Sequence, residues 1–397
     1  MAFFLLPRSN NEIYKNIEYT TTEGIPISVI SQSLCYYLYN IKEKITSREK
    51  QWDTYKKYTN PYEYIHTGVP LKKKSVSKYK PLSRSYFKMI EIINIFHINY
   101  TEPITSFHLA EGPGGFIEAL VKLRNSKEDT YIGMTLLDEN RKFANIPAWK
   151  KSEQFFKTYS NVKLENGKDG TGNILSLENF TYVTKKYKST VDFITADGGF
   201  DFSIDFNQQE SFIGKLLFAQ VAYALCIQKY KGKFILKIFD CFMQHTIDIL
   251  YILSSFYEKV YIMKPQTSRY ANSEKYIVCI GFLYDNHDMF YHYLMNSFEK
   301  MVHTEKNTLR ILNIDISYLF IKKMEEFNAI FGQKQIQNIH YTLSLMETKT
   351  KLEKIEMLIK TNIQKSTDWC IKYNIPHNIL NNPTNIFLTH FLLELNT

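Results

Sequence analysis

The chain has few of the residues that hold small folds together through disulfides or structural metals. Its 397 residues include five cysteines, and none of these stands in a C-x-x-C spacing. Scattered cysteines of this kind predict neither a zinc site nor a disulfide framework, so a reducing compartment is expected. Outside the positions discussed below, no cluster of carboxylates, cysteines or histidines has metal-ligand spacing, and no metal is predicted.

Long apolar runs are also missing. No stretch approaches the ~20 residues that cross a bilayer. The opening MAFFLLPRSN has too short an apolar run, and no cationic lead-in, for a secretory signal. We therefore expect a soluble, intracellular protein without a membrane partner. The 49 basic and 40 acidic residues leave a net charge of +9, which favours a polyanionic partner but also suits an ordinary soluble protein.

The centre of the chain, roughly residues 100 to 285, alternates short apolar runs with helical patterns. This alternation predicts an α/β fold in which helices cover both faces of a mainly parallel sheet. The final expected strand follows the one before it without room for a long helix, so we expect it to run antiparallel. The expected strands cover residues 104–110, 131–137, 191–197, 233–239, 259–265 and 276–284.

A glycine-rich turn lies between the first expected strand and a helical pattern, in HLAEGPGGFIEAL at 108–120. In open α/β sheets such a turn makes a ligand crevice, because glycine lets the backbone approach the ligand. A nucleotide derivative is the expected ligand. The spacing matches neither the dinucleotide-binding fingerprint nor the phosphate-binding loop, and a simple tight connection also remains open.

Three charged residues stand where strands end or pair. Asp197 ends a strand in TADGG, which places a carboxylate at the same sheet edge as the glycine turn. Lys237 interrupts the apolar strand KFILKIFD, which is costly unless the lysine is paired or used in chemistry, although it could also snorkel from a strand end. Glu274 enters the last strand pair, where a solvated edge residue is the alternative.

Taken together, AEGPGGF, GMTL, ADGGF, FILKIFD, KPQTSRYANSEKYIVCIGF and the upstream SRSYFKM resemble the FtsJ-like RNA ribose 2′-O-methyltransferases. The resemblance is closer to the cap-specific mRNA 2′-O-methyltransferase family, because NPYEYI at 60–65 and WCIKYNIP at 369–376 match segments outside the catalytic core. It covers roughly residues 50–376. Bacterial-type ribosomal RNA relatives share the fold and the KP-x-x-SR phrase but typically have alanine before PGG.

The resemblance implies three parts. Residues 1–80 would form an N-terminal extension with contacts to RNA or the cap, and residues 81–285 a Rossmann-like, S-adenosylmethionine-dependent methyltransferase domain. Residues 286–397 would form a mostly helical C-terminal extension. The family works in the nucleus or, for viral members, in the host cytoplasm. The implied partner is the capped 5′ end of mRNA, and other capping or transcription proteins would fit as well.

The family's catalytic tetrad of Lys, Asp, Lys and Glu falls on Lys88, Asp197, Lys237 and Glu274. A ribose hydroxyl is a poor nucleophile, so it needs a base beside it and an electrophilic methyl group aligned with it. Burial and a nearby cation lower the pKa of a lysine. We therefore expect Lys237 to take the proton, with Lys88 as the second cation and the carboxylates orienting both.

The implied methyl donor is S-adenosylmethionine, held by the glycine-rich turn and by residues matched to family contacts. Ser83 and Asn173 depart from the family, which has asparagine and aspartate there. Asn173 keeps a hydrogen-bond acceptor but loses the charge, and Asp169 could supply the carboxylate instead. Asp138 is a further candidate for the ribose hydroxyls, with a solvated loop residue as the alternative. The predicted donor-binding residues are Ser83, Ala110, Glu111, Gly112, Pro113, Gly114, Gly115, Phe116, Asp169, Asn173 and Ile174.

RNA contacts are predicted on both sides of the tetrad. The predicted contacts are Lys56, Lys57, Arg84, Asn207, Gln209 and Asn272. The lysines of LKKKSVSKYK, namely Lys72, Lys73, Lys74, Lys78 and Lys80, could track phosphates or form a solvated surface. A cap base needs aromatic stacking, but 29 tyrosines and 28 phenylalanines leave its position open.

Three function classes follow. The first is methylation of the 2′-hydroxyl of the first transcribed nucleotide of capped mRNA. The second is the same chemistry on ribosomal or transfer RNA, which a requirement for the cap would distinguish. The third is an RNA-binding scaffold that keeps the fold without catalysis, and the intact tetrad argues against it.

Overall fold

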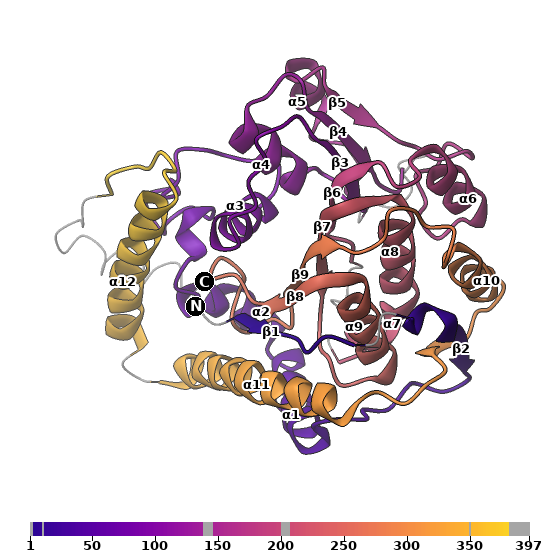
Figure 1. Cartoon of the computed structure of the whole chain (residues 1–397). Coiled ribbons are helices and arrows are strands. Elements are labelled where there is room, and N and C mark those ends of the chain that lie inside the picture. Colours follow the sequence, from indigo (N-terminus) through magenta and orange to yellow (C-terminus); the bar gives the residue numbers. More distant parts are fainter. Residues whose placement is uncertain (1–2, 10–11, 138–145, 200–206, 349–350, 381–397) are drawn as a thin grey trace.

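The computed structural model describes residues 3–9, 12–137, 146–199, 207–348 and 351–380 (Figure 1). Asp138 and residues 381–397 of the C-terminal extension lie outside these ranges. The described residues form an eight-stranded sheet in the order β1-β8-β9-β7-β6-β3-β4-β5. Its strands are β1 (Phe3–Leu5), β3 (Thr105–Leu109), β4 (Thr130–Met134), β5 (Val162–Leu164), β6 (Val191–Ala196), β7 (Gln228–Ile238), β8 (Tyr257–Met263) and β9 (Lys275–Phe282).

The predicted α/β class and the antiparallel last strand are confirmed. Strands β3 to β7 pair in parallel, whereas β9 runs antiparallel to both β7 and β8. Two strands of this sheet were not predicted. β5 has three residues of which two are exposed, so it carries no apolar run. β1 joins the edge of the sheet by pairing antiparallel with β8, a partner more than 250 residues away in the sequence.

Helices cover both faces of the sheet, which explains why its strands are apolar on both sides. Successive residues of β7 enter different cores: Leu236 packs with one hydrophobic cluster and Ile235 with the other. Figure 1 shows α3 and α4 on one side of the sheet and α8 and α9 on the other. The helices between residues 85 and 256 are α3 (Ser85–Ile95), α4 (Gly115–Arg124), α5 (Glu153–Thr158), α6 (Leu177–Lys186), α7 (Gln209–Phe212), α8 (Gly214–Ile227) and α9 (Gln244–Phe256).

The two extensions pack on the sheet unit and on each other. β2 (Ile17–Thr22) pairs antiparallel with β10 (Asn307–Leu312), so the C-terminal extension contributes a strand as well as helices. α1 (Gln32–Thr46) packs against α11 (Tyr318–Glu347). The remaining elements are η1 (Ile13–Asn16), α2 (Glu49–Tyr58), η2 (Glu63–Ile65), α10 (Tyr291–Val302) and α12 (Lys351–Lys372). Within the described ranges, no helix combines the length and hydropathy needed to cross a membrane, and no metal-ligating cluster occurs.

Candidate active site

The glycine-rich turn after β3 is built so that backbone can pack against backbone. Ala110 follows the strand with φ of 51°, a left-handed conformation that is rare for alanine. A Cβ on Gly112 would lie 2.6 Å from the carbonyl oxygen of Ala148 and 3.0 Å from Oγ1 of Thr135. Only glycine fits this close approach. The turn therefore forms a wall without side chains, and a cleft lies beside it.

That cleft has a volume of about 600 Å³ and lies at the carboxyl ends of the parallel strands. Its walls are the glycine turn, residues 135–136 after β4, residues 172–175 and the segment after β6. This is the position where open α/β sheets bind their ligands. Six of the predicted donor-binding residues line it, namely Ser83, Ala110, Gly112, Pro113, Asn173 and Ile174.

Glu111 lies buried within the turn, Gly114 is the N-cap of α4, and Gly115 and Phe116 are the first residues of that helix. One carboxyl oxygen of Glu111 accepts hydrogen bonds from the backbone N–H groups of Phe116 (2.7 Å) and Ile117 (3.0 Å). The other oxygen has no hydrogen-bond partner among the described residues. Burial raises the pKa of Glu111 to about 8, and the charge of Asp197 adds to the rise. The group is therefore protonated at neutral pH.

Asp169, predicted as a donor contact, is not among the residues that line the cleft. Its exposed carboxylate accepts hydrogen bonds from Thr171 and, at 2.8 Å, from the side chain of Asn179. Asn179 also donates to the backbone oxygen of Asn173 at 3.0 Å. Asp169 thus organises the loop that presents Asn173, while Asn173 itself lines the cleft. The sequence pattern could not show which of Asp169 and Asn173 lines the cleft, because both residues lie in the same turn-rich stretch.

The predicted tetrad comes together as two ion pairs. Nζ of Lys88, from α3, lies 2.7 Å from Oε2 of Glu274, just before β9. Nζ of Lys237, from β7, donates to the backbone oxygen of Asp197 at 2.6 Å and lies 3.4 Å from its carboxylate. β6 and β7 are adjacent and parallel, so their carboxyl ends bring Asp197 and Lys237 to one edge. Both residues line the cleft.

The pair of Lys88 and Glu274 is fixed as an ion pair. Burial opposes the charge of Glu274, but Lys88 and then Lys237 more than offset it and lower its pKa to about 2. Ser268 donates a further hydrogen bond to its Oε1 at 2.6 Å. In the pair of Lys237 and Asp197, the carboxylate is held by Tyr276, whose hydroxyl donates to Asp197 Oδ1 at 2.9 Å. Burial raises the pKa of Tyr276 well above 10, so its phenol remains a donor.

Two further charge clusters support the tetrad and were missed by the sequence analysis. Asp240 lies between Lys42 (2.8 Å) and Lys275 (3.4 Å), both of them buried. Lys264 donates to the backbone oxygen and side-chain oxygen of Asn272 and to the backbone oxygen of Glu274, at 2.6 to 2.8 Å. Asp240 and Lys275 stand inside FILKIFD and SEKY, so their nearness to tetrad positions was the available signal.

The third missed cluster joins the N-terminal extension to the site. Glu63, from NPYEYI, is fully buried and accepts hydrogen bonds from Arg269 at 2.6 and 2.9 Å. Arg84 lies 3.2 Å from the same carboxylate and donates to the backbone oxygen of Thr267 at 2.9 Å. Burial disfavours the charged form of Glu63, but the hydrogen bond from Arg269 and the charges of both arginines outweigh it. The pKa of Glu63 therefore lies well below its ordinary value.

The predicted RNA contacts divide into two groups. Lys56, Gln209 and Asn272 line a smaller hollow of about 260 Å³ that also borders Glu274, and Arg84 lines the main cleft. Lys57 is exposed outside both hollows. Asn207 donates to the backbone oxygen of Tyr39 at 3.5 Å and lines neither. The lysines of residues 72–80 are exposed or half-buried, as expected for either a phosphate path or a solvated surface.

The chain matches one protein-family model and is similar in sequence to several known proteins. The family model described as FtsJ-like methyltransferase matches residues 81–282. A protein of Trypanosoma brucei brucei named cap-specific mRNA (nucleoside-2′-O-)-methyltransferase 1 is 30% identical over 250 residues, which cover 62% of this chain and 65% of that protein. The mouse protein of the same name is 31% identical over 290 residues, covering 68% of this chain and 32% of its own. The matches thus span less than two thirds of either relative.

A crystal structure of a ribosomal RNA methyltransferase from Plasmodium falciparum is also similar, with a TM-score of 0.35 and 20% identity. That similarity covers 51% of this chain and 98% of the other.

Proposed function

Because the chain belongs to the FtsJ-like methyltransferase family, we propose that it transfers a methyl group from S-adenosylmethionine to the ribose 2′-hydroxyl of the first transcribed nucleotide of capped mRNA. The observation that carries this proposal is the arrangement of two ion pairs. Lys237 and Asp197 line the cleft beside the glycine turn, and Glu274, the partner of Lys88, lies within electrostatic reach of Lys237. The names of the trypanosome and mouse relatives support the mRNA cap as the substrate.

The residues around the cleft fit the methyl donor. The bare wall at Ala110 and Gly112 and the loop at 172–175 enclose a volume of about 600 Å³, which is the size of small-molecule sites. The unpartnered oxygen of Glu111 lies behind that wall, and Asn173 offers a polar side chain within the cleft. When bound, S-adenosylmethionine supplies an electrophilic methyl group on a positively charged sulfur.

Lys237 acts as the general base in this proposal. The 2′-hydroxyl oxygen attacks the methyl carbon, its proton passes to Nζ of Lys237, and the bond from that carbon to sulfur breaks. Of the two tetrad lysines, Lys88 is bound at 2.7 Å to a carboxylate, whereas the nearest acceptor of Lys237 is a neutral carbonyl. Lys237 also lines the cleft whereas Lys88 does not, so it is the better placed of the two lysines to meet the substrate hydroxyl.

The neighbouring groups orient the base. The backbone oxygen of Asp197 holds Nζ of Lys237 at 2.6 Å, and Tyr276 fixes the Asp197 carboxylate through its hydroxyl. Lys88 stays paired with Glu274 and contributes positive charge where the substrate oxygen becomes negative. Positioning of this kind, together with one proton transfer, is what the slow attack of a ribose hydroxyl requires.

The test is a methyl-transfer assay with matched capped and uncapped short RNAs. We expect transfer to require the cap. Lys237→Ala should lower the rate by about 10²- to 10⁴-fold while calorimetry shows unchanged donor affinity. Lys229→Ala, on the same strand but 57% exposed, is the matched control and should keep the wild-type rate.

The outcomes separate the three function classes. Equal transfer to uncapped RNA would instead support a ribosomal or transfer RNA substrate. Donor-independent RNA binding without transfer to any RNA would support a scaffold. A Lys237→Ala protein with wild-type turnover would remove the base from the proposal.

A further inference from the structure

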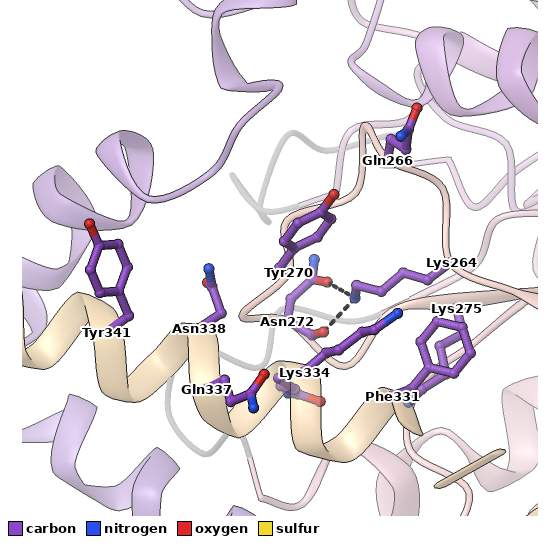
Figure 2. Close-up of a pocket in the computed structure, with 11 residues that line it drawn as sticks. Lys264, Gln266, Tyr270, Asn272, Lys275, Phe331, Lys334, Gln337, Asn338 and Tyr341 are labelled. Carbon is purple, nitrogen blue, oxygen red and sulfur yellow. Dashed lines mark hydrogen bonds between the residues drawn. The ribbon is translucent and has the colours of Figure 1, made fainter. Parts of the chain in front are cut away.

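A second pocket lies between α11 and the loop that follows β8, outside the methyl-donor cleft (Figure 2). Its volume is about 530 Å³. Among the described residues that line it are three lysines, five side-chain amides and three aromatic rings, and none is a carboxylate. The lining residues are Lys264, Gln266, Tyr270, Asn272, Lys275, Phe331, Lys334, Gln335, Gln337, Asn338 and Tyr341.

The walls of this pocket are held in place from both sides. Gln335, on α11, donates to the backbone oxygen of Ala271 at 3.0 Å, which ties the helix to the loop. On the other side, the buried carboxyl group of Glu91 accepts hydrogen bonds from the backbone of Gln266 (2.7 Å) and Thr267 (3.2 Å). A pocket with fixed walls binds its ligand without first ordering a loop.

The charge around the pocket calls for an anion. The ammonium group of Lys264 donates its hydrogen bonds to three uncharged oxygens, at Asn272 and Glu274. Burial, and then the nearby charge of Lys275, lower its pKa well below the ordinary value for lysine. Lys334 adds an exposed cation on α11. An anionic group between Lys264 and Lys334 would favour the charged form of Lys264 and pair with the charge of Lys334.

The remaining side chains suit a nucleobase. Figure 2 shows Asn338 and Tyr341 projecting from α11 on the side that faces the loop with Tyr270. Tyr341 is 44% exposed, so one face of its ring is accessible. Aromatic faces stack on bases of any sequence, and side-chain amides pair with base edges. Together with the lysines, these groups match a phosphate, a base face and a base edge.

The pocket adjoins the smaller hollow that borders Glu274. Asn272, Gln335 and Asn338 line both this pocket and the smaller hollow that borders Glu274. Lys264 lies 2.8 Å from the backbone oxygen of Glu274, whose carboxylate binds Lys88. An RNA strand with one nucleotide at the tetrad could therefore place its next nucleotide in this pocket.

We propose that this pocket binds an unmodified nucleotide of the substrate RNA on the 3′ side of the nucleotide that is methylated. Its phosphate lies near Lys264 and Lys334, and its base lies between Tyr270 and Tyr341. The methylated guanine of a cap carries positive charge, and Lys264 and Lys334, in a pocket lined by no carboxylate, disfavour that base. The inference rests on the proposed function and adds a subsite to it.

The test uses the double variant Lys334→Ala/Tyr341→Ala, which removes two exposed side chains from one face of α11. Capped RNAs with one and with six transcribed nucleotides are compared by KM and kcat. For the longer RNA, KM should rise at least about fivefold, the lower end for one stacked base, while kcat stays unchanged. KM for the shortest RNA should not change. Lys322→Ala/Tyr318→Ala, a lysine and tyrosine elsewhere on α11, is the control and should behave as wild type.

A binding measurement separates this inference from the proposed function. Fluorescence anisotropy follows an uncapped ten-nucleotide RNA on both proteins without donor, and the pocket variant should bind at least about fivefold more weakly. If the wild type methylates no RNA but this loss appears, the proposed function fails and the pocket stands. Equal affinity and equal KM at both lengths would overturn the pocket. An equal rise in KM for the shortest RNA would assign it to the cap and overturn the 3′ nucleotide.

Discussion

The buried carboxyl group of Glu111 should make the protein lose stability as the pH rises through the neutral range. Burial raises its pKa in the folded protein to about 8, whereas a glutamate in the unfolded chain titrates near 4.5. Between these two values the folded protein holds a proton that the unfolded chain has released. Stability therefore falls with rising pH by about 1.4 kcal/mol per pH unit from this group alone.

The variant Glu111→Gln removes the titration but keeps the shape. Its amide oxygen can still accept from the N–H groups of Phe116 and Ile117. Between pH 5.5 and 7.5, wild type should lose about 3 kcal/mol more of its free energy of unfolding than the variant does. Glu91 and Glu210, whose pKa values burial raises to about 7, titrate in both proteins and cancel in the comparison.

The assay is urea unfolding followed by tryptophan fluorescence at both pH values, without donor. Glu128→Gln, which changes an exposed glutamate, is the control and should follow wild type. If Glu111→Gln and wild type lose stability in parallel, the Glu111 carboxyl group is ionised in the folded protein. The conclusion that it is protonated at neutral pH would then be wrong.

Three more predictions concern the glycine-rich turn, the cluster of Glu63 with its two arginines, and the lysines of residues 72–80. Gly112→Ala places a Cβ 2.6 Å from the oxygen of Ala148, so calorimetry should show donor affinity at least about tenfold weaker with RNA affinity unchanged. Glu63→Gln leaves two arginines around a buried neutral amide and should cost about 3 kcal/mol in urea unfolding; little change would mean that solvent compensates the arginines. Lys72→Ala/Lys74→Ala should flatten the salt dependence of RNA binding by about 1.4 in log–log slope if both contact phosphates, and an unchanged slope would make them surface lysines.

The sequence predicted those parts of the fold that depend on local pattern. The short, continuous apolar runs mark β3, β4, β6, β7, β8 and β9, because strands buried on both faces need apolar residues without alternation. The carboxyl ends of β6 and β7 then bring Asp197 and Lys237 together. Lys88 required the resemblance to a family, since nothing in SRSYFKM itself separates a catalytic lysine from a helical surface lysine.

Pairings across long sequence distances could not be predicted in the same way. The contact between Glu63 and Arg269 joins residues 206 positions apart, and Lys42 meets Asp240 across 198 positions. Each residue looks like an ordinary surface charge until the fold brings its partner to it. The short strand β5 and the role of Asp169 in the loop are local, but three residues or one turn carry too little pattern to identify them.

The pairing of β2 with β10 has a consequence for how the protein is made. Asn307 is the partner of Thr22, so the first of these strands leaves the ribosome 285 residues before the second is synthesised. At roughly 5–20 residues per second, about 15–60 s pass in which β2 has no native partner. During that interval its backbone is open to other strands, and a chaperone that shields it would raise the yield of folded protein more than one that acts after release.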